Sequence, residues 1–181
     1  MGEARRKRLA ADARWKASIA ASTPSVPVTL MGLLLKASML RWEDERVRRL
    51  REVKEAGSKH GNNVVLAAFK VAVTRVFDPD VSLREISDLV ARMQEAFGDV
   101  MPWMEVEALI RHLLDEDVYV DDIDVLTRVG ASTLFLMAAA DLNGRDETFV
   151  NSVICEAEAL VWDAGLRPSL EDDSRSPESP G

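Results

Sequence analysis

Few side chains in this sequence are suited to metal binding or nucleophilic catalysis, so their spacing is informative. The 181 residues include two histidines, His60 and His112, and a single cysteine, Cys155. Neither histidine has another histidine or a cysteine three or four residues away, the spacing at which two metal ligands share a helix face. Cys155 is expected to pack as a small hydrophobic residue. We therefore predict no catalytic site, no metal site and no cofactor.

The acidic stretch 115–124 carries oxygen donors at alternating positions, as a calcium loop does. An EF-hand loop needs glycine at its sixth position and glutamate at its twelfth. Those positions hold Val120 and Leu126 here. The chain also has no G-x-x-x-x-G-K-S/T, G-x-G-x-x-G or G-x-S-x-G pattern, which would bind phosphate or supply a serine nucleophile. The acidic stretch 115–124 is therefore expected to form a solvated turn.

Positive charge is concentrated near the start of the chain. Residues 1–60 hold 14 Lys and Arg against 7 Asp and Glu, whereas residues 61–181 hold 9 against 24. A basic segment of this kind could bind nucleic acid or another anionic surface. The candidate contacts are Arg5, Arg6, Lys7, Arg8, Arg14 and Lys16. The plainer interpretations are a solvated terminal helix, or two halves of opposite charge that pack together.

Two other segments are weaker candidates for nucleic-acid binding. A helix-turn-helix that begins at Ser82 is disfavoured, because its second helix would carry Glu105 and Glu107 and only Arg111 as a cation, and phosphates would repel it. Residues 41–55 contain six basic and five acidic residues. Such mixing is typical of an exposed helix with ion pairs along its surface.

Apolar residues recur at three- and four-residue intervals from Leu30 to Val161, which predicts helices with one buried face. We expect an all-α fold, a single-domain bundle of five to seven helices. The expected helices cover 29–56, 64–77, 82–97, 102–114, 122–142 and 146–164, after a weak helix at 1–21. The alternative is an α+β fold in which 64–77 or 118–120 is a strand.

Local signals mark several helix ends. Ser82 and Glu85 have the spacing of a capping box, and Asp146 is an expected N-cap. Asn62 or Asn63 is the expected N-cap of the helix over 64–77. The predicted core comprises Leu33, Leu34, Leu66, Phe69, Val73, Ile86, Val90, Val106, Ile110, Phe135, Val150, Ile154 and Leu160.

The predicted organisation has three parts. A basic, weakly ordered N-terminal arm and linker covers 1–28, a helical domain covers 29–168, and a disordered acidic tail covers 169–181. The apolar run Val28–Leu35 is too short for a membrane span and is followed by no cleavage pattern, so we expect a cytoplasmic protein without a membrane span. The abundance of Arg, Ala and Val suggests a bacterial or phage genome.

Three functional hypotheses follow. The first is a non-enzymatic interaction, adaptor or accessory regulatory protein that binds a protein partner or forms a homo-oligomer through its helical surfaces. The second is a nucleic-acid-binding regulator that uses the basic N-terminal arm. The third is an enzyme whose site is assembled between helices and has no recognisable motif.

Overall fold

A computed structural model describes residues 25–57, 60–78, 80–114 and 116–171. The described residues form seven α-helices and no strand, which confirms the predicted all-α fold. The helices are α2 (Leu30–Met39), α3 (Glu43–Ala56), α4 (Gly61–Val76), α5 (Leu83–Phe97), α6 (Trp103–Leu113), α7 (Val125–Leu142) and α8 (Glu147–Asp163).

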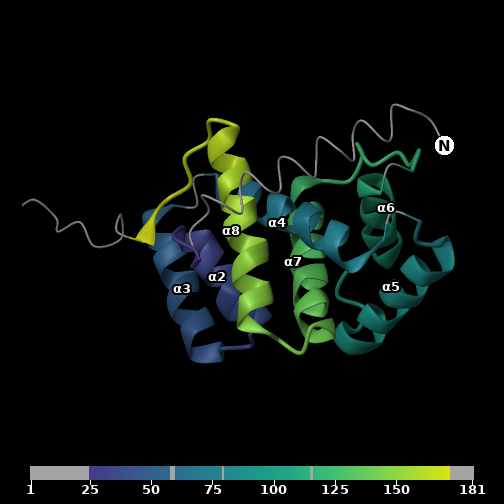
Figure 1. Cartoon of the computed structure of the whole chain (residues 1–181), viewed down its shortest axis with the longest axis horizontal. Helices are drawn as coiled ribbons and strands as arrows, with labels where there is room; N and C mark the ends of the chain where they lie inside the picture. Colours follow the sequence, from purple (N-terminus) through teal and green to yellow (C-terminus); the bar gives the residue numbers. More distant parts are fainter. Residues whose placement is uncertain (1–24, 58–59, 79, 115, 172–181) are drawn as a thin grey trace, which may run out of the picture.

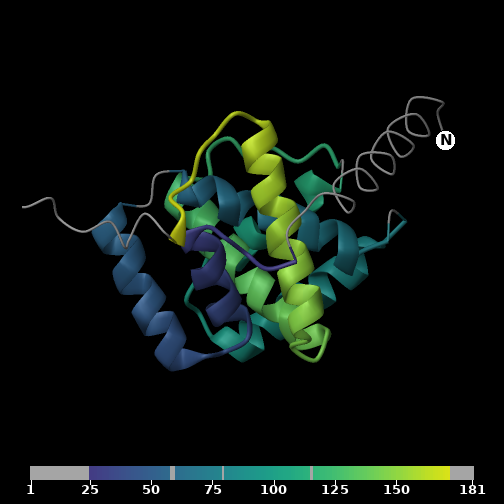
Figure 2. The same ribbon diagram turned by 60° about the vertical axis from the view of Figure 1, so that its left-hand side comes forward.

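Helix α4 lies at the centre of the bundle and contacts α2, α6, α7 and α8. Helices α7 and α8 both pack on α4 and occupy the middle of Figure 1, with α2 and α3 on one side and α5 and α6 on the other. Helix α3 packs mainly against α2 and forms one edge of the molecule (Figure 2). Helices α5 and α6 pack against each other and against α7 at the opposite edge.

Three phenylalanines join the central helices of the core. The rings of Phe69 in α4 and Phe135 in α7 meet edge to face, with their centroids 5.2 Å apart. The ring of Phe77 lies on the other side of this contact, 6.2 Å from that of Phe135. Such aromatic pairs stabilise a core beyond the area that they bury. Phe135 is fully buried, so α7 is held firmly against α4.

The predicted single helix over 29–56 is wrong, because the chain turns sharply between α2 and α3. The Trp42 N–H donates to the Ala37 carbonyl over 2.9 Å, and the Arg41 N–H donates to the Ser38 carbonyl. This pattern is a Schellman motif, which requires a left-handed residue at its centre. Arg41 takes that position with φ of 57°, although glycine is usual there. Its guanidinium bonds Asp141 of α7 over 2.8 Å, which helps to offset the strain.

The structure confirms some predicted helix ends and corrects others. Ser82 and Glu85 form the capping box at the start of α5, and Asp146 caps α8. The N-cap of α4 is His60, not Asn62 or Asn63, and the helix begins at Gly61. His60 is left-handed, with φ of 54°, and its side chain makes no capping bond. Helix α7 begins at Val125, three residues later than predicted, because Asp124 caps it.

Three residues of the predicted core lie nearer the surface than expected. Leu33, Leu34 and Leu66 are only half-buried, whereas Leu30, Leu35 and Met39 are buried. Helix α2 directs its buried face toward α4, α7 and α8. Because leucines occur all around this helix, periodicity alone did not identify which of them lie on the buried face. Leu160 is also half-buried but packs against the core. The other predicted core residues are buried.

Neither predicted strand alternative is present. Residues 64–76 belong to α4, and residues 116–120 form an extended connection. Arg128 of α7 organises that connection by donating to the carbonyls of Val120 and Ile123, each over 2.7 Å. The sole β contact in the described ranges is an isolated antiparallel bridge between Thr29 and Leu170.

The two ends of the described chain meet at this bridge. The Leu30 N–H donates to the Ser169 carbonyl, and the Glu171 N–H donates to the Val28 carbonyl. Arg49 of α3 also bonds the Glu171 carboxylate over 2.9 Å. Residues 169–171, the first three of the predicted tail, are therefore packed against the helical domain. The rest of that tail, residues 172–181, lies outside the described residues.

Helix α7 is, within the described ranges, the one helix long and apolar enough to cross a membrane, with a mean hydropathy of 1.4 over 18 residues. It passes this test by length and composition only. In the bundle it contacts α2, α4, α5 and α6, and its buried face includes Phe135, Leu136 and Ala139. The apolar character of α7 is therefore used in packing against other helices.

Candidate functional site: an acidic groove beside helix α5

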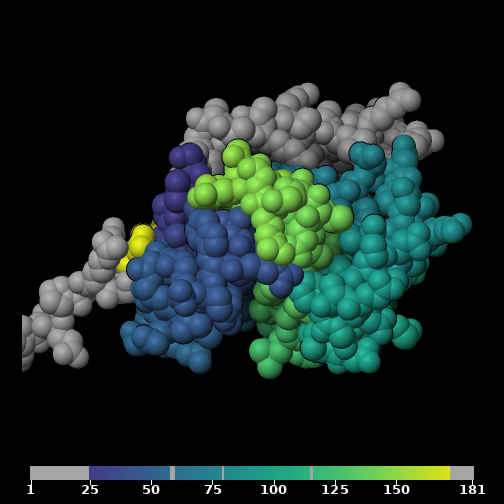
Figure 3. Space-filling model, turned by 90° about the horizontal axis from the view of Figure 1, so that it is seen from below, coloured from purple at the N-terminus to yellow at the C-terminus, as the bar shows by residue number. Residues whose placement is uncertain are grey.

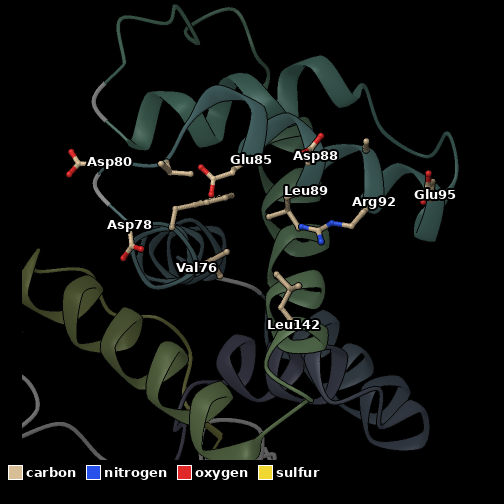
Figure 4. Close-up of a pocket in the computed structure, with 12 residues that line it drawn as sticks. Val76, Asp78, Asp80, Glu85, Asp88, Leu89, Arg92, Glu95 and Leu142 are labelled. Carbon is tan, nitrogen blue, oxygen red and sulfur yellow. The ribbon is translucent and has the colours of Figure 1, made fainter.

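The described part of the molecule contains an open groove of about 1070 Å³. It lies between α5 and the C-terminal ends of α4 and α7. Figure 4 shows Leu89 and Arg92 pointing from α5 into the space that faces Leu142 of α7. Asp78 and Asp80 lie at one end of the groove, and Glu95 lies at the other.

The groove has an acidic rim around a partly apolar floor. Leu89 is buried, with 4% of its surface exposed, while Leu142 is 52% exposed and forms the accessible apolar part of the floor. The lining residues are Val76, Phe77, Asp78, Asp80, Val81, Glu85, Asp88, Leu89, Ala91, Arg92, Glu95 and Leu142. They include five carboxylates and one cation, so the groove has a strongly negative potential at neutral pH. Small-molecule pockets are typically enclosed and mainly apolar, whereas this groove is open and polar.

The amphipathic pattern of α5 places the carboxylates at the groove. Ile86, Val90 and Met93 are buried against the bundle. Residues 85, 88, 92 and 95 recur at three- and four-residue intervals, so they form a polar stripe on the exposed part of the helix. The capping box fixes where the helix begins and therefore which side chains face the groove.

The carboxylates of the groove differ in their local partners. Glu85 accepts bonds from the backbone and hydroxyl of Ser82, and the hydroxyl bond above all lowers the pKa of its carboxyl. Asp88 lies 3.9 Å from the Arg84 guanidinium, an exposed ion pair of little energy. Glu85 is thus needed by the fold, whereas Asp88 and Glu95 can be changed without removing a helix cap.

The basic residues predicted as anion contacts, Arg5 to Lys16, all lie outside the described residues. The histidines lie on separate elements: His60 precedes α4, and His112 is near the end of α6. His112 Nδ1 lies 3.2 Å from the Val118 carbonyl oxygen. Among the residues that the structure describes, no three His, Cys, Asp or Glu side chains are grouped so that they could hold a metal.

Cys155 is 2% exposed in α8. Burial, followed by the nearby Glu158 carboxylate, raises the pKa of its thiol to about 12. A thiolate is the reactive form of cysteine, and at pH 8 roughly one thiol in ten thousand would be ionised. This environment opposes use of Cys155 as a nucleophile.

We expect the folded protein to react very slowly with 5,5′-dithiobis(2-nitrobenzoic acid) at pH 8. The chain unfolded in guanidinium chloride should release one equivalent of thionitrobenzoate within minutes, because its only thiol is then exposed. Labelling of the folded protein at the rate of the unfolded chain would contradict the burial of Cys155.

A buried carboxylate that sequence analysis did not identify joins the N-terminal end of the described chain to α8. Glu158 is 3% exposed. It accepts bonds from the Thr29 N–H at 2.9 Å, the Thr29 hydroxyl at 2.7 Å and the Val28 N–H at 3.1 Å. The Thr29 hydroxyl in turn caps α2 by accepting from the Gly32 N–H over 2.9 Å. Glu158, Thr29 and Gly32 are buried, and their bonds hold the start of α2 against α8.

The described part of this protein is thus an all-α bundle with an open acidic groove. The chain matches no family model, no curated protein and no solved structure in comparisons of sequence and fold.

Proposed function

We propose that this protein is a non-enzymatic, cytoplasmic interaction protein whose acidic groove binds a basic amphipathic segment of a partner protein. The observation that carries the proposal is the groove lining, in which five carboxylates and a single arginine surround Leu89 and Leu142. A helix with lysine or arginine on one face and leucine on the other complements both features.

The size of the groove also favours a segment of chain. A helix about 10 Å across occupies roughly 400 Å³ per turn of 5.4 Å. A groove of about 1070 Å³ therefore has room for roughly two turns of a partner helix. Its openness allows the partner chain to enter and leave at both ends, which an enclosed small-molecule pocket would not permit.

A labelled 14-residue amphipathic peptide of lysine and leucine should bind the full-length protein in a fluorescence anisotropy titration. Binding should weaken about tenfold between 50 and 300 mM salt, because exposed charges are screened. The double substitution Asp88→Lys and Glu95→Lys should weaken binding about tenfold or more. A peptide with glutamate in place of lysine should not bind.

A matched control changes the same charge elsewhere. Glu55→Lys with Asp163→Lys reverses two exposed carboxylates near the ends of α3 and α8. Figure 3 shows α3 and α5 at opposite sides of the molecule, with α8 between them. The control should bind the peptide within twofold of the wild type. If both double variants lose peptide binding equally, the loss is caused by the change in net charge. That result would refute the groove as the binding site.

Nucleic-acid binding through Arg5, Arg6, Lys7, Arg8, Arg14 and Lys16 remains the alternative function. No contact of the described residues favours it, because the groove carboxylates would repel phosphates. Salt-sensitive binding of duplex DNA that is unaffected by the groove substitutions, together with no binding of the basic peptide, would favour this alternative.

A further inference from the structure

We infer that the basic segment of this same chain, residues 5–16, occupies the acidic groove and competes there with the partner. This inference rests on the proposed function of the groove and adds how access to the groove is controlled. The segment contains six cations and a single acid, Asp12, and its apolar Leu9 and Ala13 are one helical turn apart. It therefore has the composition that the groove lining complements.

The charges of the segment and the groove are opposite and similar in size. Residues 5–16 carry a formal charge of +5, and the groove lining carries −4. Residues 61–181 as a whole hold 24 acids against 9 basic residues, so the groove lies on the acidic part of the chain. Complementary charge of this kind directs a basic segment to the groove and weakens as salt increases.

The length of the connection decides which surfaces the basic segment can reach. Residues 17–24 connect the basic segment to Ser25, the first described residue, and eight residues span at most about 27 Å. A compact domain of the described size has a radius of gyration of about 15 Å. The fully extended connection is therefore nearly twice this radius but shorter than the molecular diameter of about 39 Å, so the segment reaches surfaces within about 27 Å of Ser25. A tether that spans the distance to its site raises the effective concentration of the segment there, which makes even weak binding effective.

Competition is tested in the full-length chain with the substitutions Arg5→Gln, Arg6→Gln, Lys7→Gln and Arg8→Gln, which keep its length. This arm variant should bind the lysine–leucine peptide at least fivefold more tightly than the wild type. In the background of Asp88→Lys and Glu95→Lys the same four substitutions should change peptide affinity less than twofold. Equal affinity of the arm variant and the wild type would overturn the inference while leaving the proposed function intact.

Carbodiimide cross-linking and mass spectrometry locate the segment directly. The wild type should give cross-links from Lys7 or Lys16 to Asp88 or Glu95 in the monomer band at micromolar concentration, and Asp88→Lys with Glu95→Lys should abolish them. Cross-links found only in a dimer band would show that a second copy supplies the segment, and lysines linked only to other carboxylates would place it elsewhere. Either result would overturn the inference. Failure of every variant to bind the peptide would instead refute the proposed function.

Discussion

Replacing Gly32 with alanine should lower the free energy of unfolding by about 2–3 kcal/mol, even though alanine favours helix more than glycine does. A Cβ atom at residue 32 would overlap Glu158 Oε1 and would lie 2.9 Å from Thr29 Oγ1. Both oxygens are buried and hydrogen-bonded to each other, so neither can move away without breaking the bonds that cap α2. Urea denaturation followed by circular dichroism measures the effect.

Gly130→Ala is the matched control for this substitution. Gly130 also lies within a helix, but a Cβ there would meet only the end of the flexible Met101 side chain, 3.2 Å away. Met101 can turn aside, so the helix propensity of alanine should leave stability unchanged or raise it by up to about 1 kcal/mol. A Gly32→Ala protein as stable as the Gly130→Ala protein would show that α2 and α8 are not as close as the structure has them.

Removing the Glu158 side chain should be about as damaging. Glu158→Ala would leave the N–H and the hydroxyl of buried Thr29 without their acceptor, and each buried unsatisfied donor costs about 1–3 kcal/mol. Part of this cost is offset because a buried carboxylate no longer has to be desolvated. We expect a net loss of about 3 kcal/mol, measured by urea denaturation. Glu147→Ala, which removes a half-exposed ion pair from the same helix, should cost less than about 1 kcal/mol.

The pH dependence of stability provides a second measurement on Glu158. Burial raises the pKa of its carboxyl, more than the bonds from Thr29 and Val28 lower it. The folded chain therefore holds this proton more tightly than the unfolded chain, whose glutamate has an ordinary pKa of 4.5. The resulting stabilisation is complete below pH 4.5 and is lost as pH rises through the folded-state pKa.

Glu158→Gln removes this titration while keeping one acceptor oxygen. Above pH 4.5, the stability of the wild type should therefore fall relative to that of Glu158→Gln until the folded-state pKa is passed. Comparing the two proteins at each pH cancels groups such as Asp141, whose pKa is lowered by bonds to Arg145 and Arg41 despite partial burial. A constant difference between pH 4 and 8 would contradict a raised pKa for Glu158.

The acidic groove was only partly foreseeable from the sequence. The apolar periodicity over 82–97 predicted a helix with one buried face, which leaves the polar residues of that helix on its exposed side. The same pattern occurs on any surface helix and does not indicate a groove. What creates the recess is the position of Leu142 and the end of α4 opposite Leu89, which depends on how three helices pack.

By itself the sequence determined the all-α class and the approximate bounds of the helices, because apolar periodicity, the Ser82–Glu85 capping box and the Asp146 cap act over a few residues. Tertiary structure decided the break at Arg41, whose left-handed backbone is held by a bond to distant Asp141. It also decided the close approach of Gly32 to Glu158 and the shape of the groove. These features join residues far apart in the chain, such as Thr29 and Glu158, and local sequence patterns carry no information about such contacts.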